Sequence, residues 1–316
     1  MHTNPSIPSF PFASPIRALG CAALLAMEAT LGAAQEGAPQ RLLVANQSRI
    51  ALVAPDGTIE REVKVSGLHD GALLPNGNIL CQANWTRVME VNPAGAIVWD
   101  YDAAKSNGNQ GVPLEIHSLQ RLENGDTLIA ESGPGRLIEV DAQGKLKHTI
   151  RLTLDKPNKH RDTRLVRKTT EGTYLVAHEG DGKVREYDRD GKVIWEYQVQ
   201  PAGTLIFSAI RLQNGNTLIG TGRGKSVMEV NPQGQVVWKV GQEDLPDIKL
   251  SAVTRVERLP NGNTRFGNCH AGPNMPLCIE VTPSKQVVWS YSDFERFGNY
   301  TILVDVVPPA EKAPLN

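Results

Sequence analysis

A turn phrase built on Asn-Gly returns along the chain at a nearly constant spacing, and this period restricts the fold more than any other feature. Its glycines are Gly77, Gly125, Gly172, Gly215 and Gly262, which lie 48, 47, 43 and 47 residues apart. Asn-Gly permits the positive φ angles of two-residue hairpins, and the flanking runs alternate between apolar and polar residues. The period therefore predicts repeated antiparallel units of about 45 residues.

A second phrase lies between successive Asn-Gly turns and ends on a recurring tryptophan. It reads Gly-Gln-Val-Val-Trp at 234–238, and equivalent positions hold Trp99, Trp195 and Trp289. With the short apolar run between the two phrases, each unit reads as four antiparallel strands, which is typical of a propeller blade. We expect the four tryptophans to pack between blades as core.

The two ends of the repeat array predict how the ring closes. The first unit begins at 41–45, in the place of a second strand, so its innermost strand is missing. The run 300–307 follows the last outer strand and fits that place. The prediction is an all-β, six-bladed propeller over 41–309, with four-stranded antiparallel blades and closure by the C-terminal strand, which removes unpaired edges.

Composition and the leader predict an exported protein. The 316 residues carry a formal net charge of −1, which gives no global basicity for nucleic acid. Residues 1–34 resemble a secretory signal, because Arg17 precedes an apolar run and small residues follow. Residues 35–40 are expected to form a linker and 310–316 a tail. No other run approaches the ~20 apolar residues of a membrane span. We expect a periplasmic or secreted location.

The cysteines leave two alternatives open. Cys21 falls in the leader and Cys81 in an expected strand, whereas Cys269 and Cys278 flank one loop. A disulfide between the latter two would agree with export. Two buried free thiols are the other reading.

Propeller geometry brings equivalent positions of different blades around one axis, and this predicts a site. Counting eight residues back from each turn glycine gives the start of the innermost strand, where we find His69, His117 and Arg164. These three are the candidate catalytic residues. Loops expected on the same face, together with the position after the strand start, supply the candidate ligand-binding residues Trp85, His178, Arg223, Arg255 and His270.

The charges near this face point to an anionic ligand. The segment 145–168 is locally basic, and guanidinium groups match carboxylate and sulfate oxygens. Histidines with a carboxylate such as Glu115 or Asp70 could instead hold a metal, and a histidine could act as a nucleophile. The sequence leaves the metal, the cofactor and any partner protein open.

Two families resemble this chain. The blades are similar to pyrroloquinoline-quinone-like propeller repeats, through 188–197 and 230–238. The quinone dehydrogenases of that superfamily have eight blades and a vicinal cysteine pair, neither of which occurs here. The segments beginning at His69 and His117, each leading to an Asn-Gly turn, resemble the inner strands of bacterial arylsulfotransferases. That resemblance implies a channel histidine as sulfuryl acceptor, with histidine and arginine partners.

Two functions follow as competing expectations. The first is an exported propeller that binds an anionic small molecule or glycan at the mouth of its central channel. The second is an enzyme, either arylsulfotransferase-like with a channel histidine or a metal-assisted lyase or hydrolase.

Overall fold

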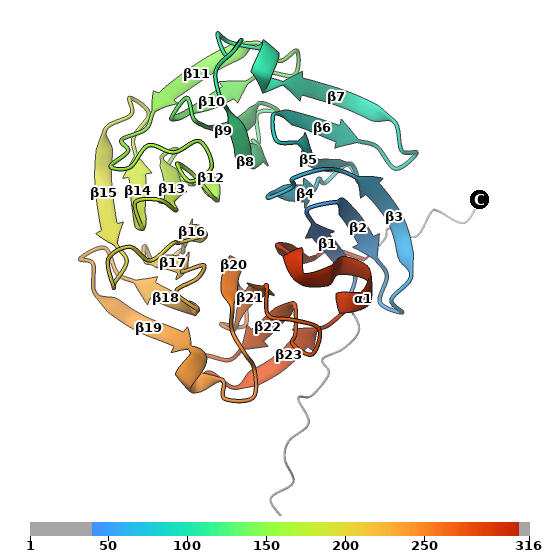
Figure 1. Cartoon of the computed structure of the whole chain (residues 1–316), viewed down its shortest axis with the longest axis vertical. Coiled ribbons are helices and arrows are strands. Elements are labelled where there is room, and N and C mark those ends of the chain that lie inside the picture. The colour runs from blue at the N-terminus through green and yellow to red at the C-terminus, as the bar shows by residue number, and fades with distance from the viewer. Residues whose placement is uncertain (1–39, 310–316) are drawn as a thin grey trace, which may run out of the picture. The chain divides into compact units, whose positions relative to one another are not determined.

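The computed structural model describes residues 40–309, which form a ring of six four-stranded antiparallel sheets (Figure 1). The predicted six-bladed all-β propeller is confirmed. The expected leader at 1–34, nearly all of the linker and the tail at 310–316 lie outside the described residues.

Each blade runs from an innermost strand near the ring axis to an outermost strand at the rim. The first blade consists of β24 (Leu303–Val306), β1 (Leu42–Asn46), β2 (Arg49–Val53) and β3 (Ile59–Lys64). The second consists of β4 (Gly71–Leu73), β5 (Ile79–Asn84), β6 (Arg87–Val91) and β7 (Ile97–Asp102). The third consists of β8 (Glu115–Arg121), β9 (Thr127–Ser132), β10 (Arg136–Val140) and β11 (Leu146–Arg151). The fourth blade consists of β12 (Val166–Lys168), β13 (Tyr174–His178), β14 (Lys183–Tyr187) and β15 (Val193–Gln198). The fifth consists of β16 (Ser208–Arg211), β17 (Thr217–Gly220), β18 (Ser226–Val230) and β19 (Val236–Gly241). The sixth consists of β20 (Ala252–Arg258), β21 (Thr264–Cys269), β22 (Cys278–Val281) and β23 (Val287–Tyr291).

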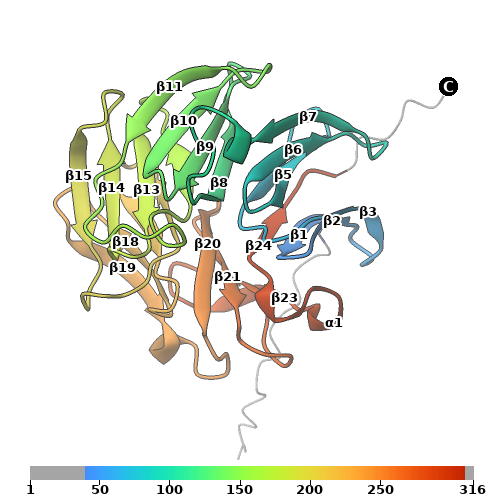
Figure 2. The same ribbon diagram turned by 45° about the horizontal axis from the view of Figure 1, so that its top comes forward.

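The C-terminal strand closes the ring, as predicted. β24 pairs antiparallel with β1, with Leu42 opposite Val306 and Ala45 opposite Leu303. Figure 2 shows β24, in red, beside β1, in blue. The first blade is therefore completed by residues from both ends of the described chain.

The hydrophobic core is divided among the blade interfaces. One cluster, for example, joins Leu128 of the third blade to Val176 of the fourth, and another joins Leu175 of the fourth to Ile219 of the fifth. Every residue of the second strands β9 and β13 is buried, so both faces of these strands pack against neighbouring blades. This packing fixes where the inner strands begin around the axis.

The recurring tryptophans pack between blades, but only one of them is core. Trp289 is 7% exposed, whereas Trp99, Trp195 and Trp238 are half-buried on the outermost strands. All four lie on outermost strands, which have solvent on one side, and Trp289 is more deeply buried because it shares a hydrophobic cluster with Phe297. An arginine side chain covers each ring, as Arg258 does for Trp238 at 5.1 Å from the ring centroid.

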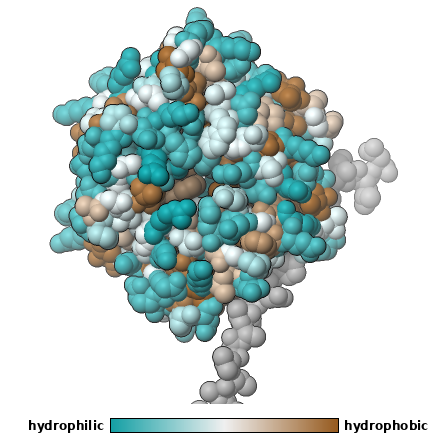
Figure 3. Space-filling model, in the orientation of Figure 1, coloured by the Kyte–Doolittle hydropathy of each residue, from teal (hydrophilic) through white to brown (hydrophobic). Residues whose placement is uncertain are grey.

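Short helical turns connect some blades and precede the closing strand. They are η1 (Ala103–Lys105), η2 (Gln242–Asp244), α1 (Phe294–Phe297) and η3 (Gly298–Tyr300). Within residues 40–309, no helix is long and apolar enough to cross a membrane. The face drawn in Figure 3 is mainly hydrophilic.

The cysteines of the described chain are free thiols. Cys81, Cys269 and Cys278 are all buried, and burial raises the pKa of each to about 12. The disulfide alternative for Cys269 and Cys278 is therefore wrong here. Sγ of Cys269 instead lies 2.9 Å from Nδ1 of His270.

Candidate functional site

The starts of the inner strands converge near the ring axis and line a pocket of about 260 Å³. His69 and Arg164 precede β4 and β12, Phe207 precedes β16, and Thr254 lies in β20. All four line this pocket. They come from four blades. Arg164, Phe207 and Thr254 follow one another at 43 and 47 residues, and His69 lies 95 residues, or two periods, before Arg164.

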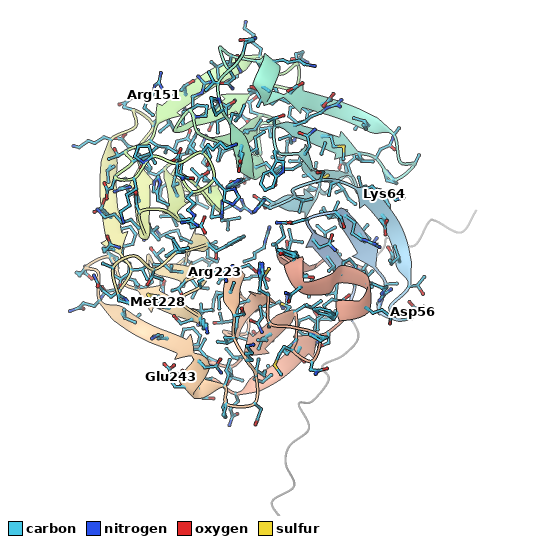
Figure 4. All side chains as sticks on the ribbon, viewed as in Figure 1. Asp56, Lys64, Arg151, Arg223, Met228 and Glu243 are labelled. Carbon is cyan, nitrogen blue, oxygen red and sulfur yellow. The ribbon has the colours of Figure 1, made fainter. Side chains whose placement is uncertain are left out.

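Cationic and imidazole side chains are prominent in the pocket lining, where the carboxylate of Glu179 occurs together with His69, His160, Arg161, Arg164, Arg223 and His270. Arg223 follows β17 and lies near the centre of the ring (Figure 4). Glu179 forms an ion pair with Arg164, at 2.5 Å. No ion pair to Arg161 or Arg223 occurs within the part of the chain that the structure describes, so the pocket presents net positive charge.

Three imidazoles and one indole gather on one side of the pocket. The His69 and His117 rings stack with centroids 4.6 Å apart, and the His160 ring stands edge-on to His117 at 5.0 Å. Trp85 lies 5.1 Å from His69. Only glycine fits at position 67, because a Cβ there would meet the Trp85 ring at 2.5 Å and φ is +70°. Trp85, which was expected to bind ligand, contacts the three imidazole rings and is not among the residues that line the pocket.

Glu115 joins this group from the first position of β8. Its Oε2 lies 3.1 Å from Nε2 of His117 and 2.6 Å from Nδ1 of His160. Lys159 Nζ lies 3.2 Å from the other carboxylate oxygen. The loop between β11 and β12 thus supplies Lys159, His160 and Arg161 to the same side of the site.

Nδ1 of each buried histidine in this group contacts a backbone carbonyl. Nδ1 of His69 lies 3.0 Å from the Gly67 carbonyl oxygen, and Nδ1 of His117 lies 3.0 Å from that of Thr163. The Arg164 guanidinium also contacts Nδ1 of His117. A carbonyl can only accept, so His69 donates through Nδ1 and its Nε2 carries the lone pair.

Burial and hydrogen bonds together decide the protonation of these groups. It lowers the pKa of His69 well below its ordinary value, with further lowering by His117 and Arg164. Burial likewise lowers the pKa of His117 to about 4, although the hydrogen bond with Glu115 opposes this. Burial alone would raise the pKa of Glu115, but hydrogen bonds from His117, His160 and Lys159 lower it to about 2. At neutral pH His69 and His117 are neutral and Glu115 is ionised.

A charged layer lies one residue further along the inner strands. The buried Asp70 carboxylate accepts hydrogen bonds from Ser118 Oγ at 2.8 Å and from Arg167 at 2.8 and 3.0 Å. Arg255 reaches the same carboxylate at 3.0 Å and pairs with Asp305 at 3.0 Å. Burial alone would raise the pKa of Asp70, but Arg167 and Arg255 lower this pKa below its ordinary value. The layer links five blades around the axis.

This layer changes the interpretation of two residues. Arg255 was expected to bind ligand, but the structure places it against Asp70 and Asp305 and outside the pocket lining. The physical reason is charge, because the two carboxylates hold the Arg255 guanidinium, whereas Thr254 lines the pocket at a point where the register of β20 against β21 shifts. Asp70, considered as a metal ligand, is already held by two guanidinium groups.

His178 also lies away from the pocket. It is fully buried at the end of β13, with Nδ1 2.7 Å from the Asp162 carbonyl oxygen and Nε2 2.9 Å from Tyr187 Oη. Burial lowers its pKa to about 4. His178 therefore anchors the β11–β12 loop from inside the blade, and the structure does not bring it to the expected ligand-binding position.

The sequence reasoning missed several pocket residues, and two of them come from the closing end of the chain. Tyr300 and Ile302 line the pocket, and the His270 and Tyr300 rings meet at 4.6 Å. They lie at the start of the inner strand of the first blade, which is β24. Counting back from a turn glycine could not reach them, because this inner strand comes from the other end of the chain.

Comparison with known families and sequences gave one family match. Residues 85–260, more than half of the chain, match the family model described as outer membrane protein assembly factor BamB. No curated protein matches the chain.

Solved structures share the fold. A protein of unknown function from Bacteroides caccae is 22% identical, with a TM-score of 0.73 over 84% of this chain and 98% of that one. A catalytically inactive variant of virginiamycin B lyase from Staphylococcus aureus with quinupristin is 11% identical, with a TM-score of 0.58 over 81% and 85%. A streptogramin B lyase is 12% identical, with a TM-score of 0.57 over 82% and 84%. At these identities the likeness concerns the fold alone.

Proposed function

The chain belongs to the PQQ-like repeat family described as outer membrane protein assembly factor BamB, and we propose that it binds an anionic small molecule or acidic glycan in the axial pocket. The observation that carries this proposal is the charge of the lining. Three arginines, Arg161, Arg164 and Arg223, share the pocket with one lining carboxylate.

The ion-pairing pattern supports an anion. Glu179 offsets the charge of Arg164, whereas no carboxylate pairs with Arg161 or Arg223 among residues 40–309. A guanidinium group donates hydrogen bonds in a planar fork that fits a carboxylate, sulfate or phosphate group. An anion would therefore take the place of the missing partners.

The remaining lining indicates that the anionic group is attached to a larger body. Leu205, Ile206, Phe207, Tyr300 and Ile302 supply apolar contacts beside the arginines. A ligand with an acidic group and an aromatic or sugar ring would use both parts of the lining.

Calorimetric titration of the purified full chain tests the proposal. The probes are phenyl sulfate, benzoate and glucuronate at low chloride concentration, because salt screens such contacts. We expect at least one probe to bind, and Arg223→Gln to weaken that binding about 10-fold or more, since hydrogen bonds to charged groups contribute about 1.5–3 kcal/mol.

The matched control is Lys225→Gln, which removes an exposed cation two residues away that does not line the pocket. It should leave binding unchanged. Equal losses in the two variants would show only a general effect of net charge, and no binding of any probe to the wild-type chain would contradict the proposal.

A second candidate function is sulfuryl transfer through His69. The observation that favours it is the hydrogen bond from Nδ1 to the Gly67 carbonyl, which leaves the Nε2 lone pair available on a pocket-lining imidazole. Nε2 would attack the sulfur of an aryl sulfate, forming an N–S bond as the S–O bond to the phenolate breaks. The phenol oxygen of an acceptor would then displace the imidazole.

Incubation with an aryl sulfate donor and a phenol acceptor tests this reaction. Transfer should depend on His69, so His69→Ala should abolish it, whereas His148→Ala, a change on the outer strand β11, should not. If the wild-type chain transfers nothing, the binding function stands alone.

The periplasmic or secreted location remains a proposal that rests on residues 1–34, and sequencing the N-terminus of the mature protein tests it.

A further inference from the structure

Two imidazoles and one carboxylate converge at the edge of the pocket in a way that the binding of an anion does not explain. Glu115, His117 and His160 each offer one ligand atom, and the three atoms lie within 4.8 Å of one another. His117 is buried and His160 is half-exposed and lines the pocket. We propose that these three residues form a binding site for a divalent metal ion of the zinc class.

The donor separations suit such an ion. With Zn–N and Zn–O bonds of about 2.0–2.1 Å, the ligand atoms of a tetrahedral ion lie roughly 3.3 Å apart. Glu115 Oε2 and His117 Nε2 are 3.1 Å apart, and Glu115 Oε2 and His160 Nδ1 are 2.6 Å apart. The third separation is at most 4.8 Å, so side-chain rotations that bring all three separations to about 3.3 Å would turn this arrangement into a ligand set.

His117 and His160 already make hydrogen bonds of the kind that support the ligands of a metal site. Nδ1 of His117 faces the Thr163 carbonyl at 3.0 Å, and metal-bound histidines almost always donate their other ring N–H to such a group. His160 is fixed through its backbone, because its N–H donates to Asn158 Oδ1 at 3.0 Å and its carbonyl accepts from Arg164 at 2.5 Å. These contacts orient both rings toward Glu115.

The metal-free and metal-bound arrangements require different tautomers of His117. When Nδ1 accepts from Arg164, Nε2 carries the proton and donates to Glu115. When Nδ1 donates to Thr163, Nε2 presents its lone pair toward the carboxylate oxygen, and a cation between them satisfies both. Glu179 offsets the nearby charge of Arg164, and Lys159 is exposed enough to move away from Glu115.

The donor set also selects the class of ion. Two imidazoles and one carboxylate are typical of zinc sites that keep a fourth position open, whereas magnesium prefers oxygen ligands alone. Because His160 lines the pocket, the ion would border the space that the arginines share. The inference concerns a different set of residues from the anion proposal and does not depend on it.

Metal titration of the full chain, prepared without a histidine tag and stripped with a chelator, tests the site. We expect one Zn²⁺ per chain in competition with a chromophoric chelator, and a visible absorption band when Co²⁺ is bound. His160→Ala should weaken Zn²⁺ binding by at least about 10- to 100-fold, the loss that removal of even an outer-shell partner causes. Mg²⁺ should not compete.

His270→Ala is the control, because it removes another pocket imidazole outside the cluster. It should leave Zn²⁺ affinity unchanged. Glu115→Gln provides a second test that keeps side-chain shape if His160→Ala fails to fold. The inference is overturned if the wild-type chain binds no Zn²⁺, if His160→Ala or Glu115→Gln binds it as tightly as the wild type, or if Mg²⁺ competes equally.

Discussion

Single residues of this site have roles that their neighbours determine. His69 and His178 are both buried histidines, but His69 lines the pocket and His178 bonds to Tyr187 inside the blade. Counting back from turn glycines selected His69, His117 and Arg164 because these positions are equivalent in every blade, and of the three His69 and Arg164 line the pocket. It could not locate His178, which ends a second strand, because hydrogen-bond partners inside a blade have no fixed sequence spacing.

His178 makes a pH-dependent contribution to stability. Burial lowers its pKa in the folded chain to about 4, from an ordinary value of 6.5. A lowered histidine pKa means that the unfolded chain binds more protons between these values, so this contribution is full above pH 6.5 and falls as the pH drops toward 4.

The measurement is the free energy of unfolding of the wild type and of His178→Gln from pH 7 to pH 4. The stability advantage of the wild type should shrink by up to about 1.4 kcal/mol per pH unit within that window. The comparison cancels other titrating groups, such as Asp305, whose pKa burial raises. An advantage that stays constant or grows as the pH falls would contradict the buried neutral form of His178.

At the scale of elements, the blades are joined at the rim by a repeated arrangement. The outermost-strand Trp195 and Trp238 donate through Nε1 to carbonyl oxygens of the next blade, at 3.0 Å to Pro232 and 2.8 Å to Pro283. The period and the tryptophan phrase predicted that these residues contact the next blade. The sequence could not show that each ring remains partly exposed to solvent, since that exposure depends on how far the neighbouring blade reaches.

Trp238→Ala should destabilise the chain by roughly 2 kcal/mol, less than the 3–5 kcal/mol of a fully buried aromatic because the ring is half-buried. The loss includes its packing against the cluster between the fifth and sixth blades and the contact with Arg258. Chemical denaturation measures it. Val237→Ala, at a side chain that is 53% exposed, is the matched control and should change stability by less than about 0.5 kcal/mol. Equal effects would contradict the interblade role.

On the scale of the whole molecule, the ring depends on a strand that is far from its partner in sequence. β24 pairs with β1, and Asp305 on β24 binds Arg255 of the sixth blade. The closure was predictable because only one run of residues was left over. The positions of the pocket residues Tyr300 and Ile302 were not predictable, since closure of the ring brings them to the pocket and they occupy no repeat position counted from a turn glycine.

Removing residues 301–316 should abolish cooperative thermal unfolding, because β1 then has an unpaired edge and two blade interfaces lose buried side chains such as Leu303 and Val304. Removing only 310–316, which follow the closing strand, is the control and should leave the melting temperature unchanged. Differential scanning calorimetry separates the outcomes. Unaltered melting of the longer truncation would contradict closure by β24.

Anion binding in the axial pocket is the central claim, and anomalous scattering from selenate, a heavier analogue of sulfate, tests it most directly. Crystals of the full chain grown without sulfate or phosphate are soaked with selenate, and the selenium position is located. We expect it within hydrogen-bond reach of the Arg161, Arg164 and Arg223 guanidinium groups that line the pocket, and we expect Arg223→Gln crystals to lose it. Selenium found only at other sites, with none in this pocket, would contradict the account.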